Sequence, residues 1–246
     1  MSTSITRNKM IDIHMHLIPG VDDGAEDMMM ARMMVLTARE QGINRIFATP
    51  HSSAFRHSEE GTKNTFQRLK DNVEDTYPDM KLYLGCEVYC EPRIMDRVVE
   101  ALNAGRYPTM NETKLVLTEF YMGAEPKDAT PCVETLVNAG YQPIIAHMER
   151  YRYLRDNMEL VDSFRKMGAL IQLNAYSLFD EDDDSIKSWA RRLVRERKVD
   201  FLGTDAHKTY HRPPCAEYGL AWLYENVEQD YADAISWGNA QKLLWG

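Results

Sequence analysis

Cysteine is scarce in this sequence: the 246 residues include four, and no two of them form a Cys-x-x-Cys pair. A fold that depends on a disulfide framework is therefore excluded. Cysteine usage this sparse is typical of proteins that fold in a reducing compartment, and we expect a cytoplasmic protein.

Long apolar runs and an excess of positive charge are also missing. No stretch of about 18 apolar residues occurs, so no segment is expected to span a membrane. The formal net charge is −9, which speaks against nucleic acid or an anionic lipid surface as a partner. Residues 1–9 are polar and lack the apolar centre of a signal peptide. We expect them to be a short disordered lead before a single domain over residues 10–246.

A short apolar run followed by an amphipathic segment recurs along the chain. Seven such runs, each bounded as buried parallel strands are, cover residues 10–14, 45–48, 81–87, 115–119, 143–146, 170–174 and 200–203. Helices are predicted over residues 25–41, 62–77, 93–104, 130–139, 159–167 and 184–198. This alternation indicates an α/β fold with a parallel sheet. The sheet either closes into a seven-stranded (β/α) barrel or stays open and doubly wound.

Histidines and acidic residues gather at the ends of the predicted strands, and five of the seven histidines lie there. In a parallel barrel the segments after the strands form one active face. Eight potential metal ligands would meet on that face: His14, His16, His51, Glu87, Glu119, His147, Asp205 and His207.

The set of ligands is more informative than any one motif. Buried carboxylates that lie close together repel one another, and a bound cation removes that cost. Imidazole and carboxylate without thiolate suit Mn²⁺, Fe²⁺, Zn²⁺ or Mg²⁺. Eight ligands exceed one tetrahedral site, so two or three ions are implied. Clusters of this kind stabilise the attacking and leaving oxygens of phosphoryl transfer.

Three further features lie near these ligands. Asp22 and Asp23 follow His16, and each could cap the next helix or bind a metal. Arg150 and Arg212 follow ligand positions by three and five residues. Guanidinium groups match phosphate oxygens in bidentate geometry, so these arginines point to an anionic substrate group in an otherwise acidic protein.

In this order, the motifs resemble those of the polymerase-and-histidinol-phosphatase (PHP) superfamily, from about Met10 to the C-terminus. They are Asp12-Ile13-His14-Met15-His16, Asp22-Asp23-Gly24, Ala48-Thr49-Pro50-His51, Gly85-Cys86-Glu87-Val88-Tyr89, Ala146-His147-Met148-Glu149-Arg150 and Gly203-Thr204-Asp205-Ala206-His207. The stretches that begin at His147 and Arg212 are most similar to the metal-dependent protein-tyrosine phosphatases of bacterial capsule and exopolysaccharide operons (the CpsB/YwqE type).

The resemblance implies a distorted, seven-stranded TIM-like barrel with three metal positions at the carboxyl ends of its strands. The implied ligands are His14, His16, Glu87 and Asp205 for the first ion, Glu87, Glu119 and His147 for the second, and Asp23, His51 and His207 for the third. Asp23 is preferred over Asp22 by position, Arg150 and Arg212 would hold phosphate, and manganese is preferred over iron, zinc or magnesium. Ser52 and Ser53 depart from the family pattern, which often has a basic or second His residue after the position of His51.

The activity implied by the resemblance is hydrolysis of phosphotyrosine in a protein by a hydroxide that bridges two metal ions. The substrate would be an autophosphorylating bacterial tyrosine kinase that controls capsule or exopolysaccharide synthesis. The alternatives are a histidinol-phosphatase-like enzyme for small phosphomonoesters, a phosphodiesterase, and an inactive metal-binding module. A cysteine nucleophile is disfavoured, because no Cys has the Arg that a Cys-x5-Arg motif requires.

Overall fold

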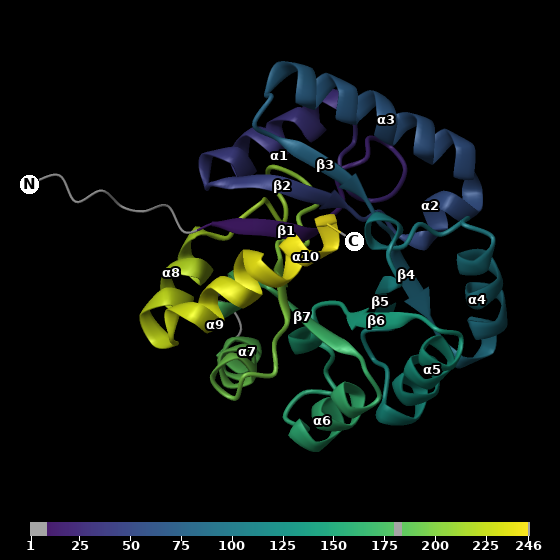
Figure 1. Cartoon of the computed structure of the whole chain (residues 1–246), viewed down its shortest axis with the longest axis vertical. Helices are drawn as coiled ribbons and strands as arrows, with labels where there is room; N and C mark the ends of the chain where they lie inside the picture. The colour runs from purple at the N-terminus through teal and green to yellow at the C-terminus, as the bar shows by residue number, and fades with distance from the viewer. Residues whose placement is uncertain (1–8, 180–183, 246) are drawn as a thin grey trace, which may run out of the picture.

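The computed structural model describes residues 9–179 and 184–245, so Lys9 is the only residue of the predicted lead within it. These residues form eight parallel strands in two sheets, ordered β1-β2-β3 and β4-β5-β6-β7-β8. They are β1 (Met10–Met15), β2 (Ile43–Ala48), β3 (Lys81–Leu84), β4 (Glu87–Cys90), β5 (Leu115–Phe120), β6 (Gln142–Ile145), β7 (Leu170–Asn174) and β8 (Phe201–Gly203). Figure 1 shows the strands surrounded by helices. The predicted α/β fold with parallel strands is confirmed.

The two sheets meet between β8 and β1. Met15 and Ala206 form a parallel bridge, the N–H of His16 donates to the Ala206 carbonyl (2.9 Å), and the N–H of Asp205 donates to the His14 carbonyl (2.7 Å). These bonds continue the pairing from the last strand to the first, so the strands follow one another around a ring.

The prediction of seven strands is wrong at the third run, which is divided into β3 and β4. β3 pairs with β2, whereas β4 pairs with β5. A Cβ atom at Gly85, which lies between them, would be 2.8 Å from the sulfur of Met110. The Met110 side chain therefore lies against this break, and a side chain at position 85 would require it to shift. The break places Glu87 at the start of a strand that belongs to the second sheet.

Ten α-helices are present among the described residues. They are α1 (Met28–Glu40), α2 (Ser52–His57), α3 (Glu59–Thr76), α4 (Met95–Asn103), α5 (Pro126–Asn138), α6 (Met158–Lys166), α7 (Asp184–Arg195), α8 (Glu217–Asn226), α9 (Gln229–Asp233) and α10 (Asn239–Trp245). The six predicted helices are confirmed with shifted ends. α1 begins later than predicted because the Asp27 carboxylate accepts the N–H of Met30 (2.8 Å) and caps the helix there. None of the helices in the described ranges has the length and apolarity needed to cross a membrane.

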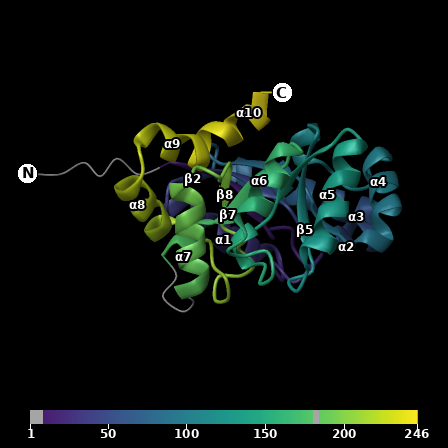
Figure 2. The same cartoon turned by 90° about the horizontal axis from the view of Figure 1, so that it is seen from below.

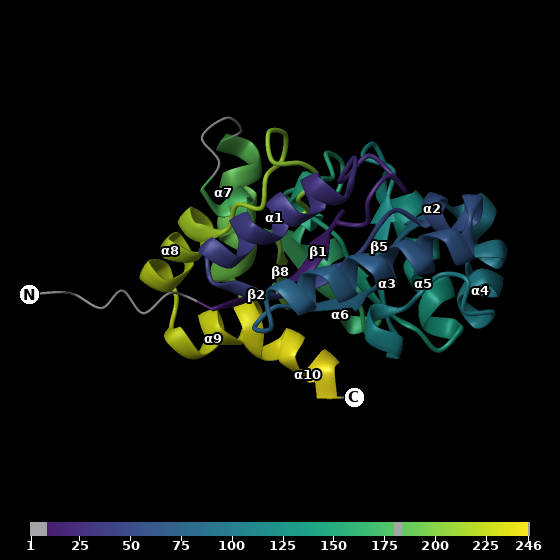
Figure 3. The ribbon, with the colours of Figure 1, turned by 90° about the horizontal axis from the view of Figure 1, so that it is seen from above.

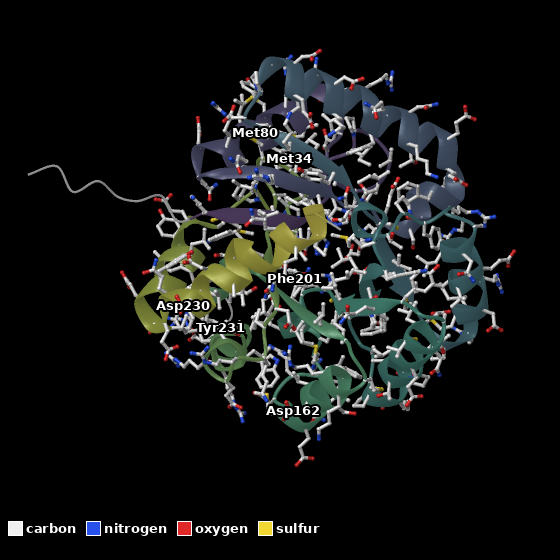
Figure 4. The ribbon with its side chains drawn as sticks, viewed as in Figure 1. Met34, Met80, Asp162, Phe201, Asp230 and Tyr231 are labelled. Atoms are coloured by element: carbon white, nitrogen blue, oxygen red, sulfur yellow. The ribbon has the colours of Figure 1, made fainter. Side chains whose placement is uncertain are left out.

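One apolar cluster fills the inside of the ring. Its buried members come from strands that are not all neighbours, from segments beside β5 and β6, and from α10: Ile11, Ile13, Phe47, Met110, Leu117, Ile144, Ala146, Phe201, Ala240 and Leu243. Figure 4 labels Phe201 near α10, and the Leu243 carbonyl accepts a hydrogen bond from the Asn111 side chain (3.1 Å). In Figure 3, α10 and the connections between α7 and α8 lie on opposite sides of the strands. Since α10 covers one end of the ring, the functional side chains lie at the other.

Candidate metal centre

The strand ends bring potential ligands together at the end of the ring opposite α10. The structure gathers side chains from six strands and from the loop after β1, and these include all nine predicted ligands: His14, His16, Asp23, His51, Glu87, Glu119, His147, Asp205 and His207. β1 departs from regular pairing between Asp12 and Met15. Such a bulge re-aims side chains next to a site.

Glu87 lies at the centre of the cluster. Its Oε1 atom is 3.2 Å from His14 Nε2 and 3.0 Å from His147 Nε2. Its Oε2 atom is 3.3 Å from His16 Nε2 and 2.9 Å from His51 Nδ1. The side chain is only 1% exposed, so four imidazoles replace water around the two carboxylate oxygens.

Three groups of ligand atoms are compact enough to hold an ion each. In the first, Asp205 Oδ1 is 3.5 Å from Nε2 of both His14 and His16, and these two nitrogens are 3.3 Å apart. In the second, Glu119 joins Glu87, with its nearer oxygens 3.5 Å from His51 Nδ1 and 3.8 Å from His147 Nε2.

The third group is more open to solvent. Asp23 Oδ1 is 3.4 Å from His51 Nε2 and 3.5 Å from His207 Nε2, and the Asp23 side chain is 66% exposed. His16 also belongs to this group, and its ring stacks on that of His207 with 3.9 Å between centroids. His16 and His51 each belong to two of the three groups, so neighbouring groups share an imidazole.

Asp22 has a different position from Asp23. Its carboxylate is 2.8 Å from His16 Nδ1 and accepts the N–H groups of Gly24 and His51 at 3.0 Å each. With Nδ1 engaged by this carboxylate, Nε2 of His16 is left as the ligand atom. The geometry therefore places Asp23 among the potential ligands and Asp22 behind one of them.

At the centre of the cluster, neighbouring charges shift the pKa values of the side chains more than burial does. Burial lowers the pKa of His14 and His16, but the carboxylates raise both pKa values, with Glu87 and Asp205 acting on His14 and Asp22 on His16. Burial raises the pKa of Glu87 and Asp205, but the imidazoles hold both pKa values well below the ordinary range. These directions favour protonated imidazoles beside ionised carboxylates when no metal ion is bound.

Metal affinity is expected to increase with pH. Because their pKa values are raised, His14 and His16 keep protons near neutral pH that a metal ion must displace. His207 releases none there, since burial and the charge of His16 lower its pKa to about 3. The apparent Mn²⁺ affinity should rise by up to ~10-fold per pH unit for each proton displaced, between about pH 6 and pH 8. Calorimetry in buffers of different ionisation enthalpy counts the protons, and a pH-independent affinity would contradict this reading.

Asp205 connects the potential metal ligands to the two predicted arginines. Its Oδ2 atom accepts from Arg150 Nη1 (2.9 Å) and from Arg212 Nη2, while Oδ1 faces the imidazoles. Arg212 Nη1 is also 3.2 Å from His207 Nε2. About a quarter of each arginine side chain is exposed, so both guanidinium groups can meet an anion that enters from solvent.

Three site residues have left-handed backbone conformations that side chains disfavour. The φ angles are 32° for His147, 54° for Asp205 and 53° for Arg212. Such conformations cost about 1–3 kcal/mol each and persist where the surrounding structure enforces them, often at functional sites. Here they are two potential metal ligands, His147 and Asp205, and Arg212, which binds Asp205.

The residues fit bound divalent cations. Three buried polar atoms of the cluster have no hydrogen-bond partner among the described residues: Glu87 Oε2, His147 Nδ1 and Arg212 Nε. Buried polar atoms are normally satisfied, and a cation beside Glu87 or an anion beside Arg212 would satisfy two of these three. The convergent donors are imidazole nitrogens and carboxylate oxygens, which suit Mn²⁺, Fe²⁺, Zn²⁺ or Mg²⁺.

The cysteines take no part in this chemistry. Cys86, Cys90 and Cys132 are buried. Burial raises the pKa of the first two well above the ordinary value and that of Cys132 to about 12. These thiols stay protonated at neutral pH and serve as packing residues.

Sequence reasoning missed the polar residues that support the ligands. Asp12 accepts the N–H of His14 (3.1 Å), and burial raises its pKa to about 6. Gln172 lies 3.2 Å from the His14 ring, and Asn174 donates to Asp205 (3.1 Å). The position of Asp12 two residues before His14 is a usable signal, whereas the amides on β7 have none.

A ring of parallel strands with histidine and carboxylate side chains at one end defines the class of barrel-shaped, metal-dependent hydrolases. A family model described as "Capsular polysaccharide synthesis, CpsB/CapC" matches residues 10–245, and the chain belongs to this family. The resemblance noted from the motifs is thereby confirmed.

Two curated proteins and one solved structure show how similar its relatives are. The chain is 28% identical to the tyrosine-protein phosphatase CpsB of Streptococcus agalactiae serotype V, over 96% of this chain and 98% of that protein. It is 31% identical to the tyrosine-protein phosphatase YwqE of Bacillus subtilis, over 82% and 79%. It also matches the crystal structures of YwqE from B. subtilis and CpsB from Streptococcus pneumoniae, described as metal-dependent tyrosine phosphatases. That match has a TM-score of 0.83 and 27% identity over 96% of this chain and 94% of the other.

Proposed function

We propose that this protein is a metal-dependent protein-tyrosine phosphatase that hydrolyses phosphotyrosine in proteins. The proposal rests on one observation, which is the contact between the potential metal ligands and the two arginines. Asp205 belongs to a group of potential metal ligands through Oδ1 and binds both Arg150 and Arg212 through Oδ2. A phosphate held by the arginines would therefore lie beside the ions. The relatives that bear the name tyrosine-protein phosphatase support the substrate class.

The ligand residues would hold two or three divalent ions, and we propose manganese. The three groups share Glu87, His16 and His51 as neighbours, with Asp205, Glu119 and Asp23 each belonging to one of them. When bound, such ions lower the pKa of a water molecule and neutralise charge on the phosphoryl group.

The chain's own residues bind and orient the substrate phosphate. Arg150 and Arg212 neutralise its charge in fixed positions, because both are anchored on Asp205. Asp22 keeps His16 in one ring orientation through Nδ1. The leaving phenolate has a pKa of about 10, so it can depart without a strong general acid from the protein.

The surroundings of the cluster favour a protein substrate over a small molecule. The third ligand group is solvent-exposed at Asp23. A cavity of about 550 Å³ lies at the ends of β4 and β5, lined by residues that include Tyr89, Arg93 and Tyr121, and Tyr89 pairs with Glu119 across these strands. Tyr121 is 66% exposed. The exposed ligand group and this cavity leave room for the residues on either side of a phosphotyrosine.

The biological setting is part of the same proposal. We infer that the substrate is an autophosphorylated bacterial tyrosine kinase that controls capsule or exopolysaccharide synthesis, and that the protein acts on it in the cytoplasm. The family description, capsular polysaccharide synthesis, supports this setting.

The test is hydrolysis of a phosphotyrosine peptide and of p-nitrophenyl phosphate, each with Mn²⁺ and with a chelator. We expect peptide hydrolysis that requires metal and is lost in His207→Ala, which removes a ligand of the exposed group. Turnover of p-nitrophenyl phosphate alone would indicate an enzyme for small phosphomonoesters. If neither substrate is cleaved by the metal-loaded protein, the phosphomonoesterase proposal fails, and a phosphodiesterase or a metal-binding module takes its place.

Replacing either arginine should reduce phosphotyrosine hydrolysis strongly. Arg150→Met or Arg212→Met removes a group that neutralises charge on the transferring phosphoryl group, and we expect kcat/KM to fall by about 10²-fold for each. Arg152→Met is the matched control, because Arg152 is exposed and its guanidinium lies over the Tyr153 ring. Equal activity of all three variants would contradict the assigned role.

A further inference from the structure

β7 has no predicted metal ligand, yet it ends beside the metal centre. It pairs with β8 on one side and β6 on the other, and Figure 2 shows β7 and β8 next to each other. Its residues Gln172 and Asn174 point to one side of the strand and are completely buried. A completely buried pair of amides needs a full set of partners, and these partners are the potential ligands.

The hydrogen bonds of the two amides run in one direction. The backbone N–H of His147 can only donate, so the atom of Gln172 that it meets at 2.8 Å is the amide oxygen. The same oxygen is 3.2 Å from His14 Nδ1, which must therefore carry a proton. Gln172 Nε2 then donates to Asn174 Oδ1 (3.0 Å).

The hydrogen bond between Asn174 and Asp205 independently requires the same orientation of both amides. Asn174 Nδ2 donates to Asp205 Oδ2 (3.1 Å), which also accepts from Arg150 and Arg212. An ionised carboxylate can only accept. Both ends thus require the orientation given above, and neither amide can be flipped without placing two donors or two acceptors against each other.

We propose that Gln172 and Asn174 are positioning residues of the metal centre, an amide relay that sets the ligand atoms of His14 and Asp205 together. By accepting from Nδ1, Gln172 leaves the lone pair of His14 Nε2 for a metal ion. By binding Oδ2, Asn174 keeps Oδ1 of Asp205 facing the same ion. Neutral amides orient His14 and Asp205 without adding charge to a site that already holds several carboxylates. The inference rests on the proposed metal centre and does not depend on the identity of the phosphorylated substrate.

The relay is tested with three variants of the full chain. Gln172→Met removes both the acceptor and the donor at nearly constant length, whereas Gln172→Glu keeps the acceptor for His14 and His147. Gln142→Met is the control, since Gln142 is a half-buried amide on β6 that binds the Gly168 carbonyl away from the site. Mn²⁺ binding is measured by calorimetry and by the electron paramagnetic resonance signal of bound Mn²⁺. Circular dichroism of the metal-free variants verifies folding.

We expect Gln172→Met to weaken Mn²⁺ binding by about 10- to 100-fold. Gln172→Glu should weaken it less, because it keeps the acceptor for His14 Nδ1 although it loses the donor to Asn174, and the control should match the unmodified protein. Unchanged affinity in Gln172→Met overturns the relay. Equal losses in both Gln172 variants also overturn it, since accepting from His14 Nδ1 then has no effect on the ligand atoms. If the unmodified protein binds Mn²⁺ but cleaves no phosphotyrosine, the proposed function fails while the relay stands; if it binds no Mn²⁺, both fail.

Discussion

Glu87→Gln is expected to reduce metal-dependent phosphotyrosine hydrolysis by at least about 10³-fold, corresponding to several kcal/mol of lost transition-state stabilisation. Glu87 contacts four imidazoles and belongs to the shared centre of the ligand groups. Glutamine has the same length, but it has no negative charge, and its amide nitrogen cannot bind a cation, so one of the two oxygens that could hold an ion is lost. Fewer ions should therefore be bound at the same Mn²⁺ concentration.

Steady-state kinetics with a phosphotyrosine peptide and metal analysis of the purified variant measure the two effects together. Glu100→Gln is the matched control, since Glu100 is an exposed carboxylate on α4, and it should retain full activity and metal content. A Glu87→Gln protein that keeps both would show that Glu87 does not bind the ions.

Gly219→Ala should destabilise the protein by about 3 kcal/mol, although alanine is the better helix former. Gly219 lies in α8, and a Cβ atom there would be 1.9 Å from the Ala175 carbonyl oxygen. A backbone oxygen cannot move aside as a flexible side chain can, so α8 or the segment Ala175–Leu178 must shift. Overpacking of this kind costs about 1–3 kcal/mol and occasionally more, which outweighs the ~1 kcal/mol that helix propensity offers.

Urea unfolding of the metal-free protein measures this effect, and Glu225→Ala at an exposed position of the same helix serves as the control. The control should stay within about 0.5 kcal/mol of the unmodified protein. A gain of about 1 kcal/mol in Gly219→Ala would show that the contact between α8 and Ala175 is not as close as described.

The fold was largely predictable because the sequence patterns that indicate its strands and helices each lie within one short segment. Short apolar runs and amphipathic segments alternate along the chain, and six of the seven predicted runs correspond to single strands. The third run divides at Gly85 because β3 pairs with β2 and β4 with β5, and the side chain beside the break, Met110, lies 25 residues away in sequence. A contact of that kind leaves no trace in the periodicity of the run itself.

The meeting of the potential ligands was predictable for a related reason. Parallel strands end on one face, so charged residues at strand ends must meet there. The choice between Asp22 and Asp23 needed the path of their loop, which turns Asp22 towards His16 Nδ1. The amides Gln172 and Asn174 could not be found, because uncharged side chains on a buried strand look the same whether they support a ligand or pack in a core.

The position of α10 has a consequence for the order in which the protein is assembled during synthesis. Residues 239–245 are translated after every strand, yet Ala240 and Leu243 belong to the apolar cluster inside the ring. A nascent chain synthesised as far as β8 therefore contains all the described strands but lacks the two α10 residues that share this cluster with Phe201 and Phe47. The apolar cluster inside the ring is therefore completed only when α10 has been translated and packs against it.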